Sequence, residues 1–150
     1  VVVAVAVGFP AGTGHPFFDR VESRLGHMML SIPASKGVVF GRGFAVAKAT
    51  GSENNDNPYV GEDGSIWRRT NHAGGIEGGI SNGMPIVLRC AFKPTASISK
   101  EQDTVNLATG QNEKLEVHGR HDPCLVPRAV PVVESAMALV LLDMLLNQAG

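Results

Sequence analysis

The sequence predicts an α+β fold in which a helix lies against at least one sheet. Two apolar runs have the length and composition of buried strands, VVVAVAVGF at the N-terminus and MPIVLRCAF from Met84 to Phe92. From Val133 to Leu146 nearly every residue is apolar, which predicts a helix buried on almost all sides. A chain of 150 residues seldom encloses one helix completely, so we expect this helix to lie between sheets, or between a sheet and further chain or a partner.

The first strand is followed by a turn cluster, GFPAGTGHP, and then by a second helical pattern. Pro16 suits the first turn of this helix, because that position needs no backbone donor. The apolar face of the helix comprises Phe17, Val21, Leu25, Met28 and Ile32. Residues 36–49 are rich in valine and phenylalanine and are broken by two glycines, which predicts an extended pair or a bulged strand.

Residues 51–70, GSENNDNPYVGEDGSIWRRT, are polar and rich in turn-forming residues. They are too many for a tight connection, so they predict a mobile loop that becomes ordered when a ligand binds. After the strand from Met84 to Phe92, a further strand is predicted from Lys114 to His118. Residues 1–150 amount to one domain.

Composition argues against several classes of partner. The chain is 43% hydrophobic and 18% charged with a net charge of −1, which gives no electrostatic basis for binding nucleic acid or an anionic membrane surface. The apolar N-terminus has no preceding basic segment, and AMALVLLDMLL is interrupted by Asp143 and too short for a bilayer, so we expect neither a signal peptide nor a membrane span. Cys90 and Cys124 lack CxxC spacing, which favours a reducing, cytoplasmic location.

Three stretches could carry chemistry, and the first is NHAGGIEGGISNG, from Asn71 to Gly83. Its glycines can form turns and a bulge that lead into the following strand. Alternatively, Gly74, Gly75, Gly78 and Gly79 allow the backbone to lie against a flat ligand or a phosphate, because no Cβ intervenes. The spacing of the common nucleotide-binding loops is absent, so a nucleotide-like cofactor would be bound by another geometry.

The second stretch, FKPTASIS, follows the apolar strand at Phe92. Lys93 supplies a positive charge, and the hydroxyls of Thr95, Ser97 and Ser99 add donors, a combination that suits a phosphate or another anion. The alternative is a strand end with a turn-forming proline.

The third stretch, HGRHDPC, precedes the apolar helix. Arg120 could hold a carboxylate or phosphate, and Asp122 could move a proton. One alternative is an Arg120–Asp122 pair that only fixes the turn. Another is a metal site at His118, His121 and Cys124, but a fourth ligand is not evident, so we expect no metal.

Four stretches together resemble the C-terminal half of the chorismate synthase family, in the same order: PFFDRVESRLGHMMLSIPASKGVVFGRGF, NHAGGIEGGISNGMPI, FKPTASI and GRHDPCLVPRAVPVVESAMALVLLD. The resemblance extends along nearly the whole chain. Family members are much longer, and their N-terminal portion carries Gly-x-Ser-His-Gly and Arg-Pro-Gly-His signatures with two catalytic histidines. Those signatures are absent from these residues, so we expect residues 1–150 to be a C-terminal portion of the family domain.

The resemblance implies a fold with helices layered between two antiparallel sheets, and a homotetramer in the full-length form. It also implies an enzyme of the carbon–oxygen lyase class. Such enzymes convert 5-enolpyruvylshikimate 3-phosphate to chorismate and phosphate in aromatic amino-acid biosynthesis. The reaction is a 1,4-elimination that requires reduced FMN but involves no net redox change.

Matching the motifs residue by residue implies the flavin contacts, which are Pro33, Ala34, Gly78, Lys93, Pro94, Thr95, Ala96, Ser97 and Arg120. Pro33 stands where asparagine can occur, so its contact is expected through the backbone. Asp122 matches the acid that assists proton removal through flavin N5, and Arg120 lies where flavin and substrate meet. His72 matches a variable position and is not counted as catalytic.

Two other classes remain open. The chain could be a catalytically incomplete module that binds FMN or phosphate, or it could be a structural subunit that binds no flavin. The length of the native reading frame upstream of Val1 would separate an enzyme from a lone fragment.

Overall fold

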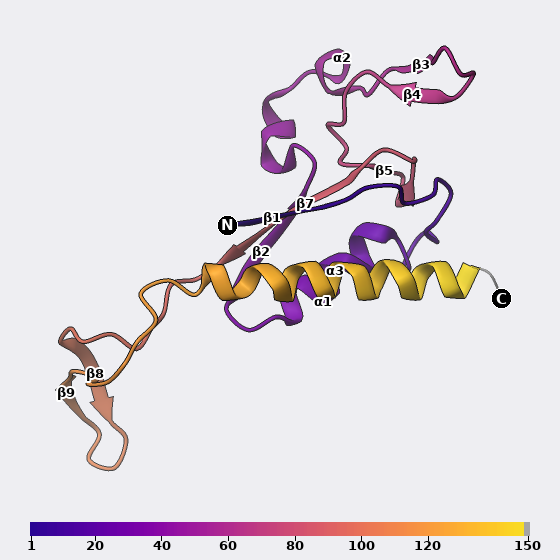
Figure 1. The fold of residues 1–150 in the computed structure, drawn as a ribbon. Coiled ribbons are helices and arrows are strands. Elements are labelled where there is room, and N and C mark those ends of the chain that lie inside the picture. The colour runs from indigo at the N-terminus through magenta and orange to yellow at the C-terminus, as the bar shows by residue number, and fades with distance from the viewer. Residues whose placement is uncertain (149–150) are drawn as a thin grey trace.

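A three-stranded antiparallel sheet forms the centre of the computed structural model, which describes residues 1–148 (Figure 1). Its central strand β7, Ile86–Phe92, lies between β1, Val2–Ala6, and β2, Ser35–Phe40. Strands are therefore confirmed at the N-terminus and within residues 84–92, but the prediction that the first strand is buried is wrong for one face, because Val3 and Val5 are exposed. Side chains of β7 alternate, and Ile86, Leu88 and Cys90 point into the core, as expected for a strand covered on one face.

The segment at residues 36–49 is a bulged strand only in its first half. The register of β2 against β7 shifts between Ser35 and Gly37, which is the predicted irregularity. The second half is a 3₁₀ helix, η1, Gly43–Lys48, so a second extended segment is wrong there. Gly41 and Gly43 both have positive φ, and these left-handed residues turn the chain away from the sheet.

Two helices pack on one face of this sheet, α1 at Val21–Ser31 and α3 at Val126–Gln148 (Figure 1). Val21, Leu25 and Met29 of α1 are fully buried among the core residues of β7 and α3. The helix begins five residues after Pro16, because His15 N–H bonds to the Asp19 carbonyl at 2.8 Å and closes a turn. Phe17 is consequently 83% exposed, and its predicted place on the apolar face is wrong.

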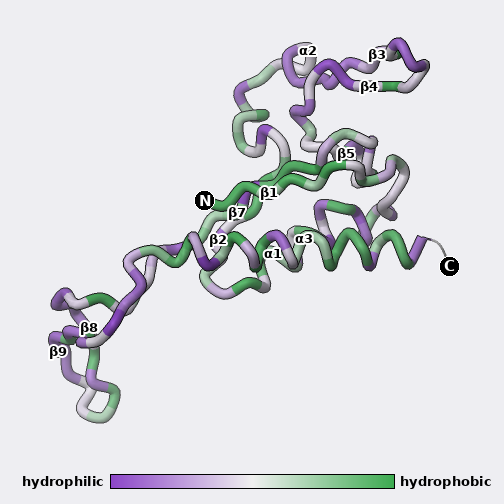
Figure 2. The backbone as a smooth tube through the Cα atoms, viewed as in Figure 1, coloured by the Kyte–Doolittle hydropathy of each residue, from purple (hydrophilic) through white to green (hydrophobic). Residues whose placement is uncertain are grey.

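Only one face of α3 is buried by the described residues, so the expectation of burial on almost all sides is wrong for this part of the chain. The buried row is Ala129, Val133, Ala136, Met137, Val140, Leu141 and Met144. Val130, Val132, Leu139, Leu142 and Leu146 are exposed on the other side. Figure 2 shows apolar residues along nearly the whole helix. This arrangement agrees with the alternative in which a sheet covers one side of α3 and further chain or a partner covers the other.

At 23 residues, α3 is long and apolar enough to span a membrane by length and composition, so the expectation that it is too short is wrong. Core helices of soluble proteins meet the same criterion. Here α3 packs on α1 and β1, and Asp143 forms an ion pair with Arg24 of α1. These contacts are those of a helix in a protein core.

The predicted mobile loop at residues 51–70 contains secondary structure. A short helix, α2, at Gly51–Asn54 is followed by a hairpin of β3, Pro58–Val60, and β4, Ile66–Arg68. Thr50 and Glu53 form a capping box that satisfies the first turn of α2. Whether the segment becomes ordered on ligand binding stays a prediction.

Asp56 ties this segment to the glycine-rich stretch. Its carboxylate accepts hydrogen bonds from Thr70 Oγ1 at 2.6 Å and from the backbone N–H groups of His72 and Ala73 at 2.7 and 2.9 Å. Burial, the largest single influence, raises the pKa of Asp56, but these hydrogen bonds together lower it below the ordinary value of 3.8. Asp56 is therefore favoured as the ionised carboxylate in the folded protein.

We expect Asp56→Asn to lower the free energy of unfolding by about 1–3 kcal/mol at pH 7, because an amide cannot accept all three bonds. A lowered pKa stabilises the fold above pH 3.8, and this contribution is lost as the pH falls through the folded-state value. Urea unfolding at pH 7 and pH 3 should therefore show a smaller difference from the parent protein at pH 3. Asp63→Asn, in an exposed turn, is the control and should have little effect. Equal losses for the two variants would contradict the role of Asp56.

Two further hairpins complete the fold. β5, Ile76–Glu77, and β6, Ile80–Ser81, form a tight hairpin in the glycine-rich stretch. β8, Gln102–Asn106, and β9, Gln111–Leu115, form a hairpin that projects away from the sheet (Figure 1). The predicted strand from Lys114 to His118 overlaps β9 at only two residues, Lys114 and Leu115.

Candidate functional site

The end of β7 brings two of the predicted segments together. Ser35 pairs with Phe92 in the sheet, so the residues just outside this pair must lie side by side. The backbone N–H of Lys93 donates to the Ala34 carbonyl at 2.9 Å. Ala34 has a φ of 68°, a left-handed conformation that is uncommon for a residue other than glycine and is often found at functional sites. Three of the predicted site residues, Pro33, Ala34 and Lys93, thus lie together at this end of the sheet.

The same site includes the segment around Asp122. Thr95 Oγ1 donates to the Asp122 carbonyl at 3.2 Å, and Ser99 Oγ donates to the Val117 carbonyl at 3.3 Å. These bonds fasten the FKPTASIS and HGRHDPC stretches to each other across the base of the β8–β9 hairpin. Between them lies a depression of about 340 Å³, lined by Pro94, Thr95, Ile98, Ser99, Gly119, His121, Asp122 and Pro123.

Positive charge at this site is available to a ligand. Lys93 and Arg120 are exposed, and neither forms an ion pair with any residue from 1 to 148. Ala96 and Ser97 are also exposed, whereas Thr95 is half-buried. Lys93 and Arg120 do not line the depression themselves but adjoin residues that do, Pro94, Gly119 and His121, and two free cations there suit an anionic ligand.

Asp122 has a different partner from the one that its sequence neighbours indicate. Its carboxylate lies 2.7 Å from Arg128 Nη1, in the first turn of α3. The alternative of an Arg120–Asp122 pair is therefore wrong, because Asp122 pairs with Arg128 and not with Arg120. The ring of His121 meets the Val117 carbonyl at 2.9 Å, and no cluster of three metal-ligating side chains occurs within residues 1–148.

Backbone packing accounts for most of the glycine-rich stretch. A Cβ on Gly74 would come within 2.4 Å of the Gly41 nitrogen, and one on Gly75 within 2.6 Å of the Pro85 carbonyl oxygen. A Cβ on Gly79 would meet the Arg20 side chain at 2.5 Å. Real Cβ atoms do not approach other atoms so closely, so these three glycines are needed by the fold itself.

Gly78 differs from its neighbours. It is exposed at the turn of the β5–β6 hairpin, and a Cβ there would meet nothing within 4 Å. Its hairpin and Lys93 lie at opposite ends of β7 (Figure 1). Seven strand residues measure roughly 20 Å from end to end. This chain therefore does not bring Gly78 together with Lys93 and Asp122, and a shared flavin contact for all three stays a prediction.

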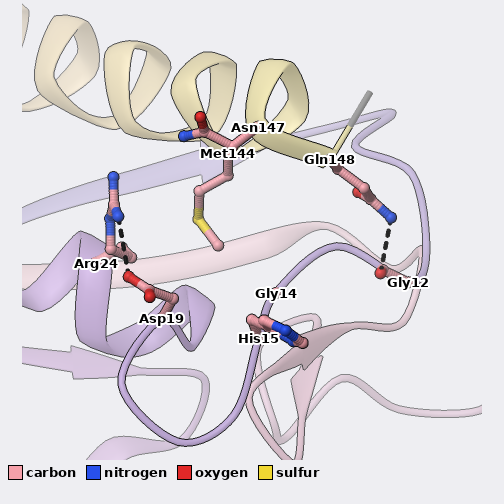
Figure 3. A pocket seen from close by; sticks show the side chains of 8 residues that line it. All are labelled: Gly12, Gly14, His15, Asp19, Arg24, Met144, Asn147 and Gln148. Carbon is pink, nitrogen blue, oxygen red and sulfur yellow. Dashed lines mark hydrogen bonds and ion pairs between the residues drawn. The ribbon is translucent and has the colours of Figure 1, made fainter. Parts of the chain in front are cut away.

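Another cavity of about 490 Å³ lies between the start of α1 and the end of α3 (Figure 3). Its polar lining includes His15, Asp19 and Arg24, and Arg24 is already paired with Asp19 at 3.0 Å and with Asp143. Gln148 Nε2 donates to the Gly12 carbonyl at 3.1 Å across its rim. None of the predicted site residues lines this cavity. The GTGHP stretch, which supplies Gly12, Gly14 and His15 to the lining, contains no motif that indicates a particular chemistry.

Comparisons with known proteins agree with the resemblance. The family model of chorismate synthase matches residues 1–146. The chain is 55% identical to chorismate synthase from Rippkaea orientalis over 150 residues, covering 100% of this chain and 41% of that protein. It is also 55% identical to chorismate synthase from Archaeoglobus fulgidus over 148 residues, covering 99% of this chain and 41% of that protein.

A crystal structure of chorismate synthase is similar to this fold with a TM-score of 0.78 at 34% identity, covering 99% of this chain and 37% of that one. The chain thus spans about two fifths of the length of the relatives that it matches. Both sequence and fold agree along nearly the entire chain, and we conclude that it belongs to the chorismate synthase family.

Proposed function

We propose that the full-length protein that contains this chain converts 5-enolpyruvylshikimate 3-phosphate to chorismate and phosphate. The observation that carries the proposal is the gathering of three family motifs at one end of β7, where Ala34 contacts Lys93 and Thr95 contacts Asp122. Sheet pairing and the β8–β9 hairpin bring these distant motifs together, and their polar and charged side chains then share one region of the surface. The activity would place the protein in aromatic amino-acid biosynthesis as a carbon–oxygen lyase.

The residues at this site fit an anionic flavin. Lys93 and Arg120 have no carboxylate partners within residues 1–148, so their charges can balance a phosphate or a reduced isoalloxazine. Ser97 supplies a hydroxyl donor, and the left-handed residue Ala34 lies beside Lys93, to which its carbonyl is bonded. We propose that Pro33, Ala34, Arg120 and the segment from Lys93 to Ser97 hold reduced FMN, with Gly78 as a further contact. Reduced FMN would supply electron density that assists departure of the phosphate.

The protein side chains would hold the substrate and move the proton. In the proposed 1,4-elimination a carbon–oxygen bond to phosphate breaks and a proton leaves carbon. Arg120 would stabilise the negative charge on the substrate. Asp122 lines the depression and has a partly exposed carboxylate, so it is placed to accept a proton.

From the resemblance to the family we also propose that the full-length protein is a homotetramer. The cysteine usage supports a cytoplasmic location. The exposed apolar side chains on α3 support burial of this face by further chain or by another subunit.

A second candidate function is a module that binds FMN without catalysis. The two-fifths coverage of the relatives favours it for the isolated chain, because the resemblance implies catalytic histidines outside this region.

Anaerobic incubation of the full-length protein with reduced FMN and 5-enolpyruvylshikimate 3-phosphate should form chorismate. Lys93→Gln should weaken FMN binding about tenfold or more, because it removes a charge-assisted contact. Lys100→Gln, an exposed lysine beyond the motif, is the control and should leave the FMN dissociation constant unchanged. FMN binding without chorismate formation would favour the second candidate, and equal affinities for both variants would contradict the assigned cofactor site.

A further inference from the structure

We infer that Arg128 is a positioning residue for Asp122, an inference that rests on the proposed function of Asp122 as a proton acceptor. Arg128 Nη1 lies 2.7 Å from Asp122 Oδ2. Asp122 lies in an irregular segment between β9 and α3, where neither helix nor sheet fixes its side chain. The contact with Arg128 is the one ion pair that the Asp122 carboxylate makes with the described residues.

The backbone of Arg128 is held by hydrogen bonds in the first turn of α3. Its backbone N–H and that of Ala129 both bond to the Leu125 carbonyl at 3.1 Å, which closes the first turn of α3. Ala129 is buried, and Val133 one turn later is fully buried in the core. The guanidinium therefore extends from a helix that is pinned to the sheet. The Asp122 carboxylate that pairs with it is thereby connected to the core through α3.

The geometry leaves one half of the carboxylate available. Arg128 engages Oδ2, and the described residues provide no hydrogen bond to Oδ1. The backbone of Asp122 is held separately, because its carbonyl accepts the bond from Thr95. Asp122 is thus fixed at its main chain and at one carboxylate oxygen, while Oδ1 is free to take a proton from a ligand in the depression.

The ion pair contributes little to folding. The side chains of Arg128 and Asp122 are 78% and 43% exposed, and solvent-exposed pairs of this kind are worth roughly 0–1 kcal/mol. Orientation of a reacting group is far more sensitive, since a misplacement of about 1 Å can cost a hundredfold in rate. A function in positioning therefore explains the contact better than a function in stability.

A double-mutant cycle in the full-length protein tests this inference. Its members are the parent protein, Asp122→Asn, Arg128→Gln and the double variant, each assayed for kcat, for the FMN dissociation constant and for melting temperature. We expect Arg128→Gln to lower kcat about tenfold to a hundredfold with an unchanged FMN dissociation constant. In the Asp122→Asn background the same substitution should change kcat less than about twofold, because the group that it positions is already inactive.

Two further variants make the result specific. Arg128→Lys keeps the charge and should recover part of kcat. Lys114→Gln breaks an exposed ion pair with Asp103 on the β8–β9 hairpin and should leave kcat unchanged.

Parent-like kcat in Arg128→Gln would overturn the inference. So would multiplicative losses in the double variant, or a weaker affinity for FMN, because either would mean that Arg128 acts on a ligand directly. Normal kcat in Asp122→Asn alone would instead remove Asp122 from the proposed mechanism, and the inference with it.

Discussion

Asp122→Asn in the full-length protein is expected to lower turnover by a factor on the order of 10²–10³, while the affinity for FMN changes little. Asparagine keeps the size of the side chain and can still bond to Arg128 through its amide oxygen, but it has no basic site. The measurements are anaerobic turnover with saturating reduced FMN, the FMN dissociation constant and the melting temperature. A well-folded variant with normal turnover would remove Asp122 from the mechanism.

Arg120→Ala is the informative comparison for that variant. We expect it to weaken the binding of both FMN and substrate, because Arg120 is an exposed cation without an ion-pair partner in residues 1–148. If the turn were only structural, both substitutions would instead lower the melting temperature and reduce activity in proportion to the folded fraction. The three measurements on two variants separate these possibilities.

The second large effect is expected at Gly75. Gly75→Ala should lower the free energy of unfolding by about 2–5 kcal/mol, from the strain of a positive φ and the overlap of a new Cβ with the Pro85 carbonyl. Gly78→Ala is the matched control, because its φ is also positive but the space around it is open, and we expect a loss of about 1–2 kcal/mol. Urea unfolding of both variants gives the comparison.

The FMN dissociation constant of Gly78→Ala then tests whether this glycine also meets the cofactor. Equal losses of stability at Gly75 and Gly78 would contradict the assignment of Gly75 to backbone packing.

Apolar runs and helical periodicity predicted the elements that form the core. α1 and α3 bury apolar residues at helical spacing, whereas β1 and β7 were predicted from continuous apolar runs, of which β1 buries only Val2. β8 was missed because its sequence, QDTVN, has no buried face, and its partner β9, QNEKL, is exposed throughout. These strands are held by pairing with each other, and pairing leaves no periodic apolar signal.

The site was predictable only in parts. Lys93 and Thr95 carry a recognisable chemistry, but their closeness to Ala34 and Asp122 depends on the pairing of Ser35 with Phe92 and on the path of the β8–β9 hairpin. The one ion-pair partner that the sequence analysis considered for Asp122, Arg120 in the alternative of a structural turn, is not the arginine that pairs with it. Arg128 lies in the first turn of α3, and the path of the chain between Asp122 and this turn brings the two side chains together. The distance between the two residues along the sequence does not predict this contact.

The β8–β9 hairpin also affects how freely this chain can change over evolutionary time. The site lies at its base, where Thr95 and Ser99 bond across to the returning chain, whereas its tip at Leu107–Gly110 is exposed. Residues can be inserted or lost at such a tip without a shift in the pairing below it. Length variation there would therefore leave the FKPTASIS and HGRHDPC segments in register, and the tip is the natural place to attach a label or a tag.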